Sequence, residues 1–249
     1  MKNEKISIII PAYNAEIFIE DTIMKIITRM NELQITNYEI NLIENGSTDK
    51  TSDIVNNLAK EYKQINLIIL DEADLGKAVK KGIEFSNGSF SIYMPADLSY
   101  EINFINSALE YKKKGYEVIF GSKKMKQSSV EITRSRKFLS SGFSMLVKIL
   151  FRFKIKDTQG VKAFQTDLFR DYTKTFPNGF LWDIGFVYIT SRKNYKWVEI
   201  PCKVVDLHKS STIKKLRISI KMLIGLIKFR LIASAKAKKA DKFLIRDNT

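Results

Sequence analysis

The feature that most constrains the fold is a regular alternation of short apolar runs with longer amphipathic stretches, starting near the N-terminus. Short β-branched runs bounded by turn or polar residues predict buried strands. Five are present: Ile6–Ile10, Ile40–Ile43, Leu67–Leu70, Phe90–Met94 and Val118–Phe120. Because these strands are apolar on both faces, they are typical of a parallel sheet covered by helices. The alternation therefore predicts an α/β fold.

Apolar residues between these runs recur at the spacing of one helix face. Ile19, Ile23, Ile26, Met30 and Leu33 follow one another at intervals of four, three, four and three residues. Two shorter sets repeat the pattern: Leu75, Val79 and Ile83, and Ile102, Ile105 and Leu109. Ligands of such sheets bind beyond the carboxyl ends of the strands. The loops that follow the strands are therefore where functional residues are expected.

The composition excludes several classes of protein. An apolar share of 45% is ordinary for a globular chain of 249 residues and excludes disorder. Cys202 is the only cysteine, so no intrachain disulfide can form, which fits a reducing compartment. His208 is the only histidine, so a zinc site built on several His and Cys is excluded. Because residues 1–5 lead directly into the first predicted strand, we expect no signal peptide.

The positive charge is concentrated near the C-terminus. Residues 203–249 contain 13 Lys or Arg and 3 Asp or Glu, which gives +10 of the total net charge of +15. Such a tail predicts an anionic partner: nucleic acid, an anionic membrane or a phosphorylated substrate. The alternative is a basic face that is simply solvated. We expect no nucleic acid, because Phe229 and Phe243 are the only aromatic residues after Trp197 that could stack on bases.

The same C-terminal region carries an apolar stripe. Its longest uninterrupted apolar run, Met222–Ile227, is shorter than the roughly 18 residues that a membrane span needs. A helical stripe flanked by Lys and Arg is formed by Leu216, Ile220, Leu223, Ile227 and Leu231. Basic amphipathic helices of this kind lie in the interface of anionic membranes. The alternative is that the stripe packs on the core or on a partner chain.

The loops after the first two predicted strands read PAYNAE (residues 11–16) and ENGSTDKT (residues 44–51). Asn45 and Gly46 followed by Ser, Thr and Asp are typical of a turn and helix cap, because these side chains bond free backbone N–H groups. A carboxylate at the end of a strand can also accept hydrogen bonds from a ribose or a base. Glu44 and Asp49 are placed for that second role.

Two later loops carry candidates for phosphate and metal binding. Lys77, Lys80 and Lys81 lie near the start of a predicted helix, where the helix dipole disfavours cations unless an anion is present. A solvated lysine face is the alternative. Asp97 follows the fourth strand, where one carboxylate could bind a divalent cation that clamps a diphosphate. Capping a helix is the alternative role for Asp97.

In this order the segments resemble glycosyltransferase family 2, which comprises nucleotide-sugar enzymes with a Rossmann-like, mostly parallel GT-A fold. The resemblance is carried by SIIIPAYNAE, ENGSTDKT, LGKAVKKGI and PADLS. The segment DTQGVKAF, residues 157–164, is similar to one in the polyprenyl- and dolichyl-phosphate sugar transferases, and LWDI, residues 181–184, fits that subfamily more weakly. The resemblance implies a catalytic domain over residues 1–205, followed by a basic amphipathic helical segment over residues 206–249.

The resemblance implies roles for individual residues. It places these at the nucleotide sugar: Pro11, Tyr13, Glu16, Glu44, Asn45, Gly46, Asp49, Lys77, Ala96 and Asp97. Asp97 and Gln159 would be ligands of Mg²⁺ or Mn²⁺, with Asp157 behind them. Pro95 stands where the family's Asp-x-Asp motif has its first aspartate, so we expect weaker metal binding. The donor diphosphate can supply the missing ligands.

For the acceptor, the resemblance implies a lipid phosphate. A phosphate monoester has a second pKa near ~6 and is largely a dianion at neutral pH, so its attack needs no general base. Arg134 and Arg136 are expected to contact this phosphate and to be catalytic together with Asp97, unless they merely cap an exposed helix. Lys209 and Ser210 form a second candidate phosphate site.

The implied activity is inverting transfer from GDP-mannose or a UDP-hexose to polyprenyl or dolichyl phosphate. The enzyme would be cytoplasmic, peripheral at the cytoplasmic face of a membrane, and a membrane-anchored partner subunit is allowed. One alternative is transfer to a saccharide hydroxyl of a cell-surface polymer. The other is a nucleotide-sugar-binding relative without turnover, which Pro95 would favour.

Overall fold

The computed structural model describes residues 4–131, 134–205 and 223–231, with side chains for all of these except 130, 131, 134–141 and 205. The described chain divides into two compact units. The larger unit holds residues 4–131 and 154–205, and the smaller one holds residues 134–153 and 223–231. Most of the predicted C-terminal segment, 206–249, lies outside the described residues, so the boundary at residue 205 stays a prediction.

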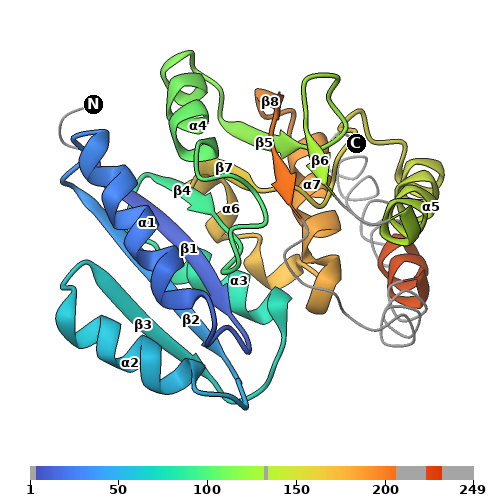
Figure 1. The fold of residues 1–249 in the computed structure, drawn as a ribbon. Helices are drawn as coiled ribbons and strands as arrows, with labels where there is room; N and C mark the ends of the chain where they lie inside the picture. Colours follow the sequence, from blue (N-terminus) through green and yellow to red (C-terminus); the bar gives the residue numbers. More distant parts are fainter. Residues whose placement is uncertain (1–3, 132–133, 206–222, 232–249) are drawn as a thin grey trace, which may run out of the picture. The chain divides into compact units, whose positions relative to one another are not determined.

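A seven-stranded sheet forms the centre of the larger unit (Figure 1). In pairing order its strands are β3 (Ile65–Leu70), β2 (Tyr38–Asn45), β1 (Ile6–Ala12), β4 (Phe90–Tyr93), β7 (Lys162–Gln165), β5 (Val118–Ser122) and β8 (Trp197–Pro201). Strand β7 runs antiparallel to both neighbours, and every other pair in this sheet is parallel. The predicted mostly parallel α/β sheet is confirmed, and each of the five predicted strands overlaps one of these strands.

Beyond the main sheet, two short strands pair with each other. They are β6 (Val130–Glu131) and β9 (Val204–Val205), which run parallel. The backbone N–H of Val204 also donates to the carbonyl of Ser129 at 2.8 Å. These contacts tie the end of the larger unit to the chain that follows β5.

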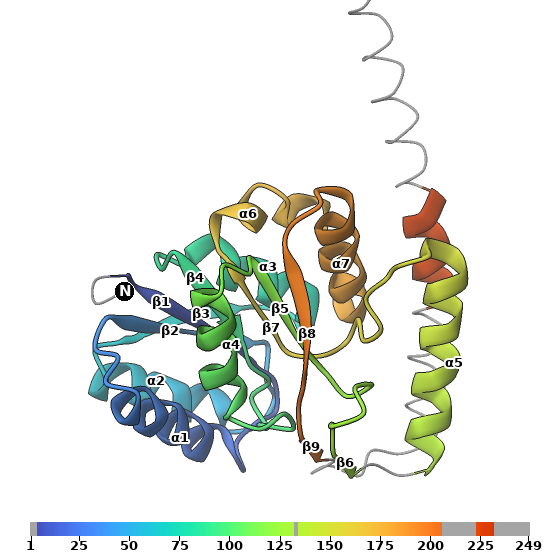
Figure 2. The same ribbon diagram turned by 90° about the horizontal axis from the view of Figure 1, so that it is seen from above.

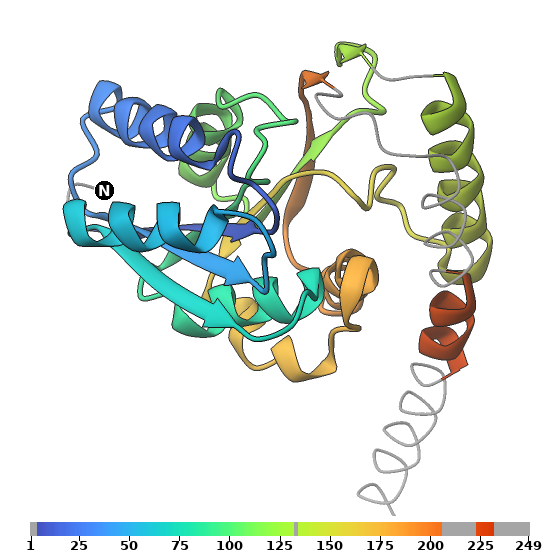
Figure 3. The same ribbon diagram turned by 60° about the horizontal axis from the view of Figure 1, so that its bottom comes forward.

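Helices cover both faces of the main sheet (Figure 3). On one face lie α1 (Ile19–Glu32), α2 (Thr51–Glu61) and α4 (Phe104–Lys113). On the other lie α3 (Leu75–Phe85), α6 (Asp167–Arg170) and α7 (Trp182–Arg192), with the 3-10 turns η1 (Thr173–Thr175) and η2 (Gly179–Leu181) between α6 and α7. The three helices predicted from periodicity correspond to α1, α3 and α4.

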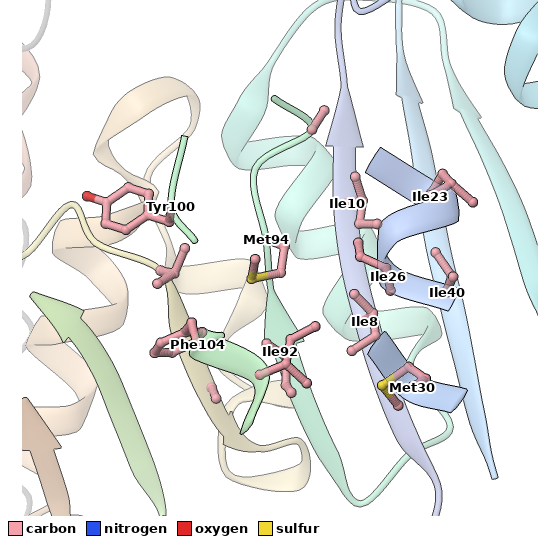
Figure 4. Close-up of a cluster of buried hydrophobic side chains, with 14 of the residues drawn as sticks. Ile8, Ile10, Ile23, Ile26, Met30, Ile40, Ile92, Met94, Tyr100 and Phe104 are labelled. Carbon is pink, nitrogen blue, oxygen red and sulfur yellow. The ribbon is translucent and has the colours of Figure 1, made fainter. Parts of the chain in front are cut away.

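The main core lies beneath α1, α2 and α4 (Figure 4). Ile8 and Ile10 are alternate residues of β1 that face these helices, and they pack with Ile40 of β2 and Ile92 of β4. The helices contribute the buried side chains of Ile23, Ile26, Met30 and Phe104. Burial of apolar surface contributes about 25 cal/mol per Å², so this packing, more than helix propensity, holds the layers together.

Near the amino ends of the strands, one buried carboxylate joins three segments. Glu39, 2% exposed, accepts hydrogen bonds from the Ser7 hydroxyl at 2.7 Å and the Asn87 backbone N–H at 2.6 Å, and it pairs with Lys5 Nζ at 2.5 Å. Burial raises the pKa of Glu39, but the bonds from Lys5, Asn87 and Ser7 outweigh burial and lower the pKa to about 2. A lowered carboxyl pKa stabilises the fold above the unfolded-state pKa.

We expect Glu39→Gln to reduce the free energy of unfolding by about 3 kcal/mol at pH 7, because the Glu39 pKa falls from 4.5 to about 2 on folding. The deficit should shrink as the pH falls from 4.5 towards 2, where the native carboxylate gains its proton. Urea unfolding between pH 7 and pH 3 measures it. The control is Glu32→Gln, which alters a carboxylate whose side chain is 55% exposed. A deficit independent of pH would contradict the assignment.

The smaller unit consists of α5 (Arg134–Phe151) and the helical segment 223–231, which lie side by side (Figure 2). Between them, Arg230 Nε donates to the carbonyl of Leu150 at 2.8 Å, and the rings of Phe151 and Phe229 lie 5.9 Å apart. Leu226 is buried. Other large apolar side chains of this unit are exposed: Met145, Ile149, Leu223, Ile224, Ile227 and Leu231.

The predicted apolar stripe is only partly described. Its members Leu223, Ile227 and Leu231 are exposed, and Leu216 and Ile220 lie outside the described residues. Within the described ranges, the helices are all too short or too polar to cross a bilayer.

Candidate active site

The loops after β1 and β2 are joined by hydrogen bonds at the carboxyl edge of the sheet. The Thr48 backbone N–H donates to Asn14 Oδ1 at 2.9 Å, and the Lys50 N–H donates to Glu16 Oε2 at 2.9 Å. Asp49 accepts the Glu16 N–H at 3.3 Å and the Thr51 N–H at 3.0 Å. Glu16 and Asp49 thus shape these two loops, and for Asp49 this is the turn-and-cap role given as the alternative. The role of both residues at a nucleotide stays a prediction.

Pro11 and Ala12 end β1 at this edge, and Tyr13 follows them. Pro11 is buried within the strand and lies beside Ile43 of β2. Tyr13 is 46% exposed, so its ring is available to a ligand that approaches the loops. This arrangement is compatible with the predicted place of Pro11 and Tyr13 beside a base or ribose.

The end of β2 fixes the next turn. Buried Glu44 accepts the backbone N–H of Gly46 at 3.2 Å and of Ser47 at 2.7 Å. Buried Asn45 accepts the Asp74 N–H at 2.9 Å. Gly46 has φ +65°, and a Cβ there would lie 2.9 Å from the backbone nitrogen of Ala73, so only glycine fits. Glu44 therefore shapes the β2 loop itself, and Asn45 and Gly46 hold that loop against the one that leads into α3.

At the start of α3, one aspartate connects distant parts of the chain. Asp74 Oδ1 accepts the Lys77 N–H at 2.8 Å, which caps the helix, and the Gly179 N–H at 2.7 Å. Lys80 donates to the carbonyl of Phe176 at 3.1 Å and also bonds the Asn178 side chain. Lys80 therefore holds the segment that precedes α7.

The other two lysines of α3 have different surroundings. Lys81 pairs with Glu84 at 3.1 Å on the outer face of the helix. The Lys77 side chain is 49% exposed and lies 3.7 Å from Glu72, a weak contact between exposed groups. Lys77 is accordingly the lysine of α3 best placed for an anionic ligand.

Asp97 lies in a tight turn after β4. The Leu98 N–H donates to the Pro95 carbonyl at 3.1 Å, Leu98 has φ +45°, and the Thr22 hydroxyl donates to the Ala96 carbonyl at 2.7 Å. Asp97 Oδ1 accepts the Ser99 N–H at 2.9 Å, and Asp97 is half-buried. A non-glycine residue held at positive φ is uncommon and clusters at functional sites.

The DTQG segment lies against the end of β5. Buried Asp157 accepts the Lys123 N–H at 2.9 Å and the Gln159 N–H at 3.2 Å. A Cβ at Gly160 would lie 1.8 Å from the carbonyl oxygen of Gly121, so only glycine allows this approach. The Tyr100 hydroxyl donates to the Gln159 carbonyl at 3.4 Å, which links the segment to the loop after β4. Asp157 thus fixes the backbone of Gln159, and the metal-binding role of Gln159 stays a prediction.

A buried ion pair lies next to this segment. Lys162 of β7 is fully buried and bonds Asp183 of α7, and it also donates to the Gly160 carbonyl at 2.8 Å. The Lys162 ammonium lies 4.6 Å from the Trp182 ring centre. Burial raises the pKa of Asp183 to about 6, against the opposing effect of Lys162. Lys162 is therefore the counter-charge that favours the ionised form of the buried Asp183 carboxyl.

The residues around Asp97 fit a metal that is shared with a diphosphate. In the described chain, no group of three or more His, Cys, Asp or Glu is gathered as metal ligands. Mg²⁺ is often held by one or two carboxylates together with substrate phosphates. Asp97 would supply one such carboxylate, and the amide of Gln159 is the predicted second ligand. The site does not fit a cation bound by protein carboxylates alone.

The predicted acceptor-phosphate residues cannot be placed in the site. Arg134 and Arg136 lie in the first turn of α5, and their side chains are outside the described part of the structure. Lys209, Ser210 and His208 also lie outside the described residues. Their roles stay predictions.

The sequence assigned no site role to Tyr93, Lys123, Lys162 or Asp183, although Lys162 and Asp183 stand in the DTQGVKAF and LWDI segments. A signal existed for Lys162, because a lysine between Val161 and Ala163 interrupts an apolar run that is otherwise typical of a buried strand. Tyr93 gave no signal, because an aromatic residue at a strand end is common.

The chain is similar to known proteins over most of its length. The model of the family described as "Glycosyl transferase family 2" matches residues 7–180. A dolichol-phosphate mannosyltransferase of Pyrococcus furiosus is 32% identical over 154 residues, which cover 61% of this chain and 43% of that protein. This chain therefore spans less than half the length of the archaeal relative.

Two further relatives match over most of the chain. A dolichyl-phosphate beta-glucosyltransferase of Dictyostelium discoideum is 28% identical over 257 residues, covering 92% of this chain and 78% of that protein. A dolichyl-phosphate beta-glucosyltransferase of Trichomonas vaginalis is 30% identical over 240 residues, covering 88% of this chain and 68% of that protein.

Among solved structures, glucosyl-3-phosphoglycerate synthase of Mycobacterium tuberculosis, in complex with Mn²⁺, UDP-glucose and phosphoglyceric acid, has a TM-score of 0.67. It is 14% identical, and the match covers 92% of this chain and 80% of that one. TarS of S. aureus has a TM-score of 0.57 at 16% identity, and the match covers 81% of this chain and 60% of that one. At these identities the likeness concerns the fold, and it confirms the expected GT-A type.

Proposed function

Because the chain belongs to glycosyltransferase family 2, we propose that it transfers a sugar from a nucleotide-sugar donor to a polyprenyl or dolichyl phosphate. The choice of a lipid phosphate as acceptor rests on the similarity to two dolichyl-phosphate beta-glucosyltransferases over 92% and 88% of this chain. The arrangement of the site supports the donor, since the loops after β1, β2 and β4 meet at the carboxyl edge of the sheet, where nucleotides bind in such folds.

The proposed reaction is a single inverting displacement. An oxygen of the lipid phosphate attacks C1 of the sugar, the new O–C1 bond forms, and the bond from C1 to the nucleoside diphosphate breaks with the electron pair leaving on the diphosphate. The acceptor oxygen is already ionised near neutral pH, so no residue has to remove a proton. The protein's task is to align the two anions and to balance their charge.

Asp97, Gln159 and Lys77 are the residues we assign to the donor diphosphate. A bound Mg²⁺ or Mn²⁺ would neutralise charge on the leaving diphosphate. Asp97 would hold that ion together with the phosphate oxygens, which fits a site with Pro95 in place of a second carboxylate. Lys77, exposed at the start of α3, would contact the diphosphate directly.

We further propose that the smaller unit binds the surface of an anionic membrane, where a lipid phosphate is found. The exposed side chains of Met145, Ile149 and Ile227 are apolar, and Lys148 and Lys228 on the same two helices are exposed cations. Basic amphipathic helices insert their apolar face at the headgroup boundary. The enzyme would then be a peripheral membrane protein, and we propose the cytoplasmic face as its location.

The experiment that tests the function is a donor screen. UDP- and GDP-hexoses carrying a radiolabelled sugar are incubated with a short polyprenyl phosphate, with and without Mg²⁺ or Mn²⁺. We expect label in the organic phase from at least one donor, and release of that sugar by mild acid. Label that appears only on a saccharide acceptor would support the alternative acceptor. Binding of UDP or GDP without transfer from any donor would support a relative without turnover.

Membrane binding is tested separately by sedimentation with vesicles of phosphatidylglycerol and phosphatidylcholine. Burying an isoleucine contributes about 1.5–3 kcal/mol, so Ile149→Ser combined with Ile227→Ser should weaken binding at least about tenfold. Ile69→Ser is the matched control, because Ile69 is 58% exposed but belongs to β3. Equal binding of the double variant and the wild type would contradict this surface.

A further inference from the structure

A polar cluster outside the predicted set of site residues lies where β4, β7 and α7 meet. Tyr93 ends β4 and stands opposite Lys162 in the β4–β7 register. The Tyr93 ring packs edge-on against Trp182, with ring centres 4.9 Å apart, and Lys162 bonds Asp183 beside it. The turn that holds Asp97 begins directly after Tyr93. The cluster therefore adjoins the turn that carries Asp97.

Three polar groups of this cluster keep hydrogen-bonding capacity. The Tyr93 hydroxyl makes no hydrogen bond to any residue that the structure describes. The Tyr93 side chain is half-buried, so part of it stays exposed. The buried indole N–H of Trp182 has no acceptor within the described chain. Asp183 uses Oδ1 for Lys162, and its side chain stays 11% exposed. An unpartnered buried N–H is unfavourable until a ligand or a water molecule satisfies it.

The protonation state of Tyr93 suits a donor of hydrogen bonds. Burial raises the pKa of the Tyr93 hydroxyl, and the negative charges of Asp183 and Asp97 raise it further. Tyr93 therefore keeps its proton throughout the physiological range. A tyrosine hydroxyl can both donate and accept, an indole N–H only donates, and a carboxylate only accepts. Sugar hydroxyls match such a mixed set, because each of them donates and accepts.

We propose that Tyr93, Trp182 and Asp183 form the subsite that binds the hydroxyl groups of the donor sugar and selects among hexoses. This inference rests on the proposed function and adds the residues that hydrogen-bond the sugar. The position supports it, because C1 of the sugar is bonded to the diphosphate, and the diphosphate site at Asp97 begins where Tyr93 ends. A site that hydrogen-bonds a sugar hydroxyl rejects an analogue without it, since its buried polar groups then stay unpaired.

The test is Tyr93→Phe, which removes one oxygen and keeps the ring against Trp182. Dissociation constants of nucleotide sugars and of UDP and GDP are measured by calorimetry, so that the result does not depend on transfer. We expect binding of the nucleotide sugar to weaken about tenfold, with binding of the matching nucleoside diphosphate unchanged within about twofold. The control is Tyr111→Phe on α4, whose ring contacts Tyr116 away from this cluster.

A series of donors with one hydroxyl at a time replaced by hydrogen sharpens the test. One of these donors should bind equally to the wild type and to Tyr93→Phe, because its missing hydroxyl is the partner of Tyr93. The subsite would be overturned if Tyr93→Phe weakened the binding of the nucleotide sugar and of the nucleoside diphosphate equally, or changed the binding of neither. Donor binding without transfer would instead overturn the proposed function alone. If neither UDP, GDP nor any nucleotide sugar binds the wild type, both proposals fail.

Discussion

Asp97→Asn should lower sugar transfer at least about 100-fold, because the carboxylate that shares the metal with the diphosphate is lost. Charge stabilisation by a bound divalent ion contributes several kcal/mol, and each 1.36 kcal/mol corresponds to a factor of ten in rate. The asparagine keeps the oxygen that accepts the Ser99 N–H, so the turn that contains Ala96 and Leu98 should survive. The measurement is kcat/KM as a function of Mn²⁺ concentration.

The matched control for this variant is Asp53→Asn, which alters an exposed carboxylate in the first turn of α2. It should leave transfer within about twofold of the wild type. Thermal unfolding of both variants checks that the fold is retained. If Asp97→Asn were as active as Asp53→Asn at every metal concentration, Asp97 would not be the metal ligand.

Lys162→Met should destabilise the fold by about 3–5 kcal/mol, because it leaves the Asp183 carboxylate buried without a counter-charge. Asp183 already has a pKa raised to about 6 with Lys162 present, and removal of Lys162 raises this pKa further. A raised carboxyl pKa favours the protonated native state, so the deficit should shrink as the pH is lowered from 8 towards 5. Urea unfolding at several pH values measures it.

Two further variants separate charge from packing. Lys162→Met combined with Asp183→Asn removes the uncompensated charge and should recover part of the lost stability. Lys63→Met replaces an exposed lysine and should change the free energy of unfolding by less than about 0.5 kcal/mol. A deficit in Lys162→Met that is the same at pH 5 and pH 8 would show that lost packing, rather than the charge on Asp183, causes it.

The sequence pattern predicted the part of the sheet in which strand and helix alternate. β1 to β5 were found because their runs are apolar on both faces, and α1, α3 and α4 because each has one apolar face. β7 was missed because Lys162 breaks its apolar run, and β8 because Trp197–Pro201 mixes apolar and charged residues. α7 has no clear polar face, since most of its residues are buried, so helical periodicity could not show it.

The candidate site was predictable only where a local motif carries it. Asp97 and Asp157 stand in short motifs, and the structure shows how backbone N–H groups hold both. Tyr93, Trp182 and Asp183 come together through the pairing of β4 with β7 and the packing of α7. Trp182 and Asp183 stand in the LWDI segment, but their contact with Tyr93 is long-range in the sequence and only the fold shows it.

The place of β7 between β4 and β5 also determines the order in which the sheet can be completed during synthesis. Both partners of β5, namely β7 and β8, follow it in the chain. A nascent chain that has not yet reached Lys162 therefore holds an apolar strand, Val118–Ser122, with both edges open, while β1 to β4 can already pair. Unpaired apolar strands are where nascent chains aggregate or recruit chaperones. Truncations that end before β7 should therefore be insoluble even though they contain the first four strands.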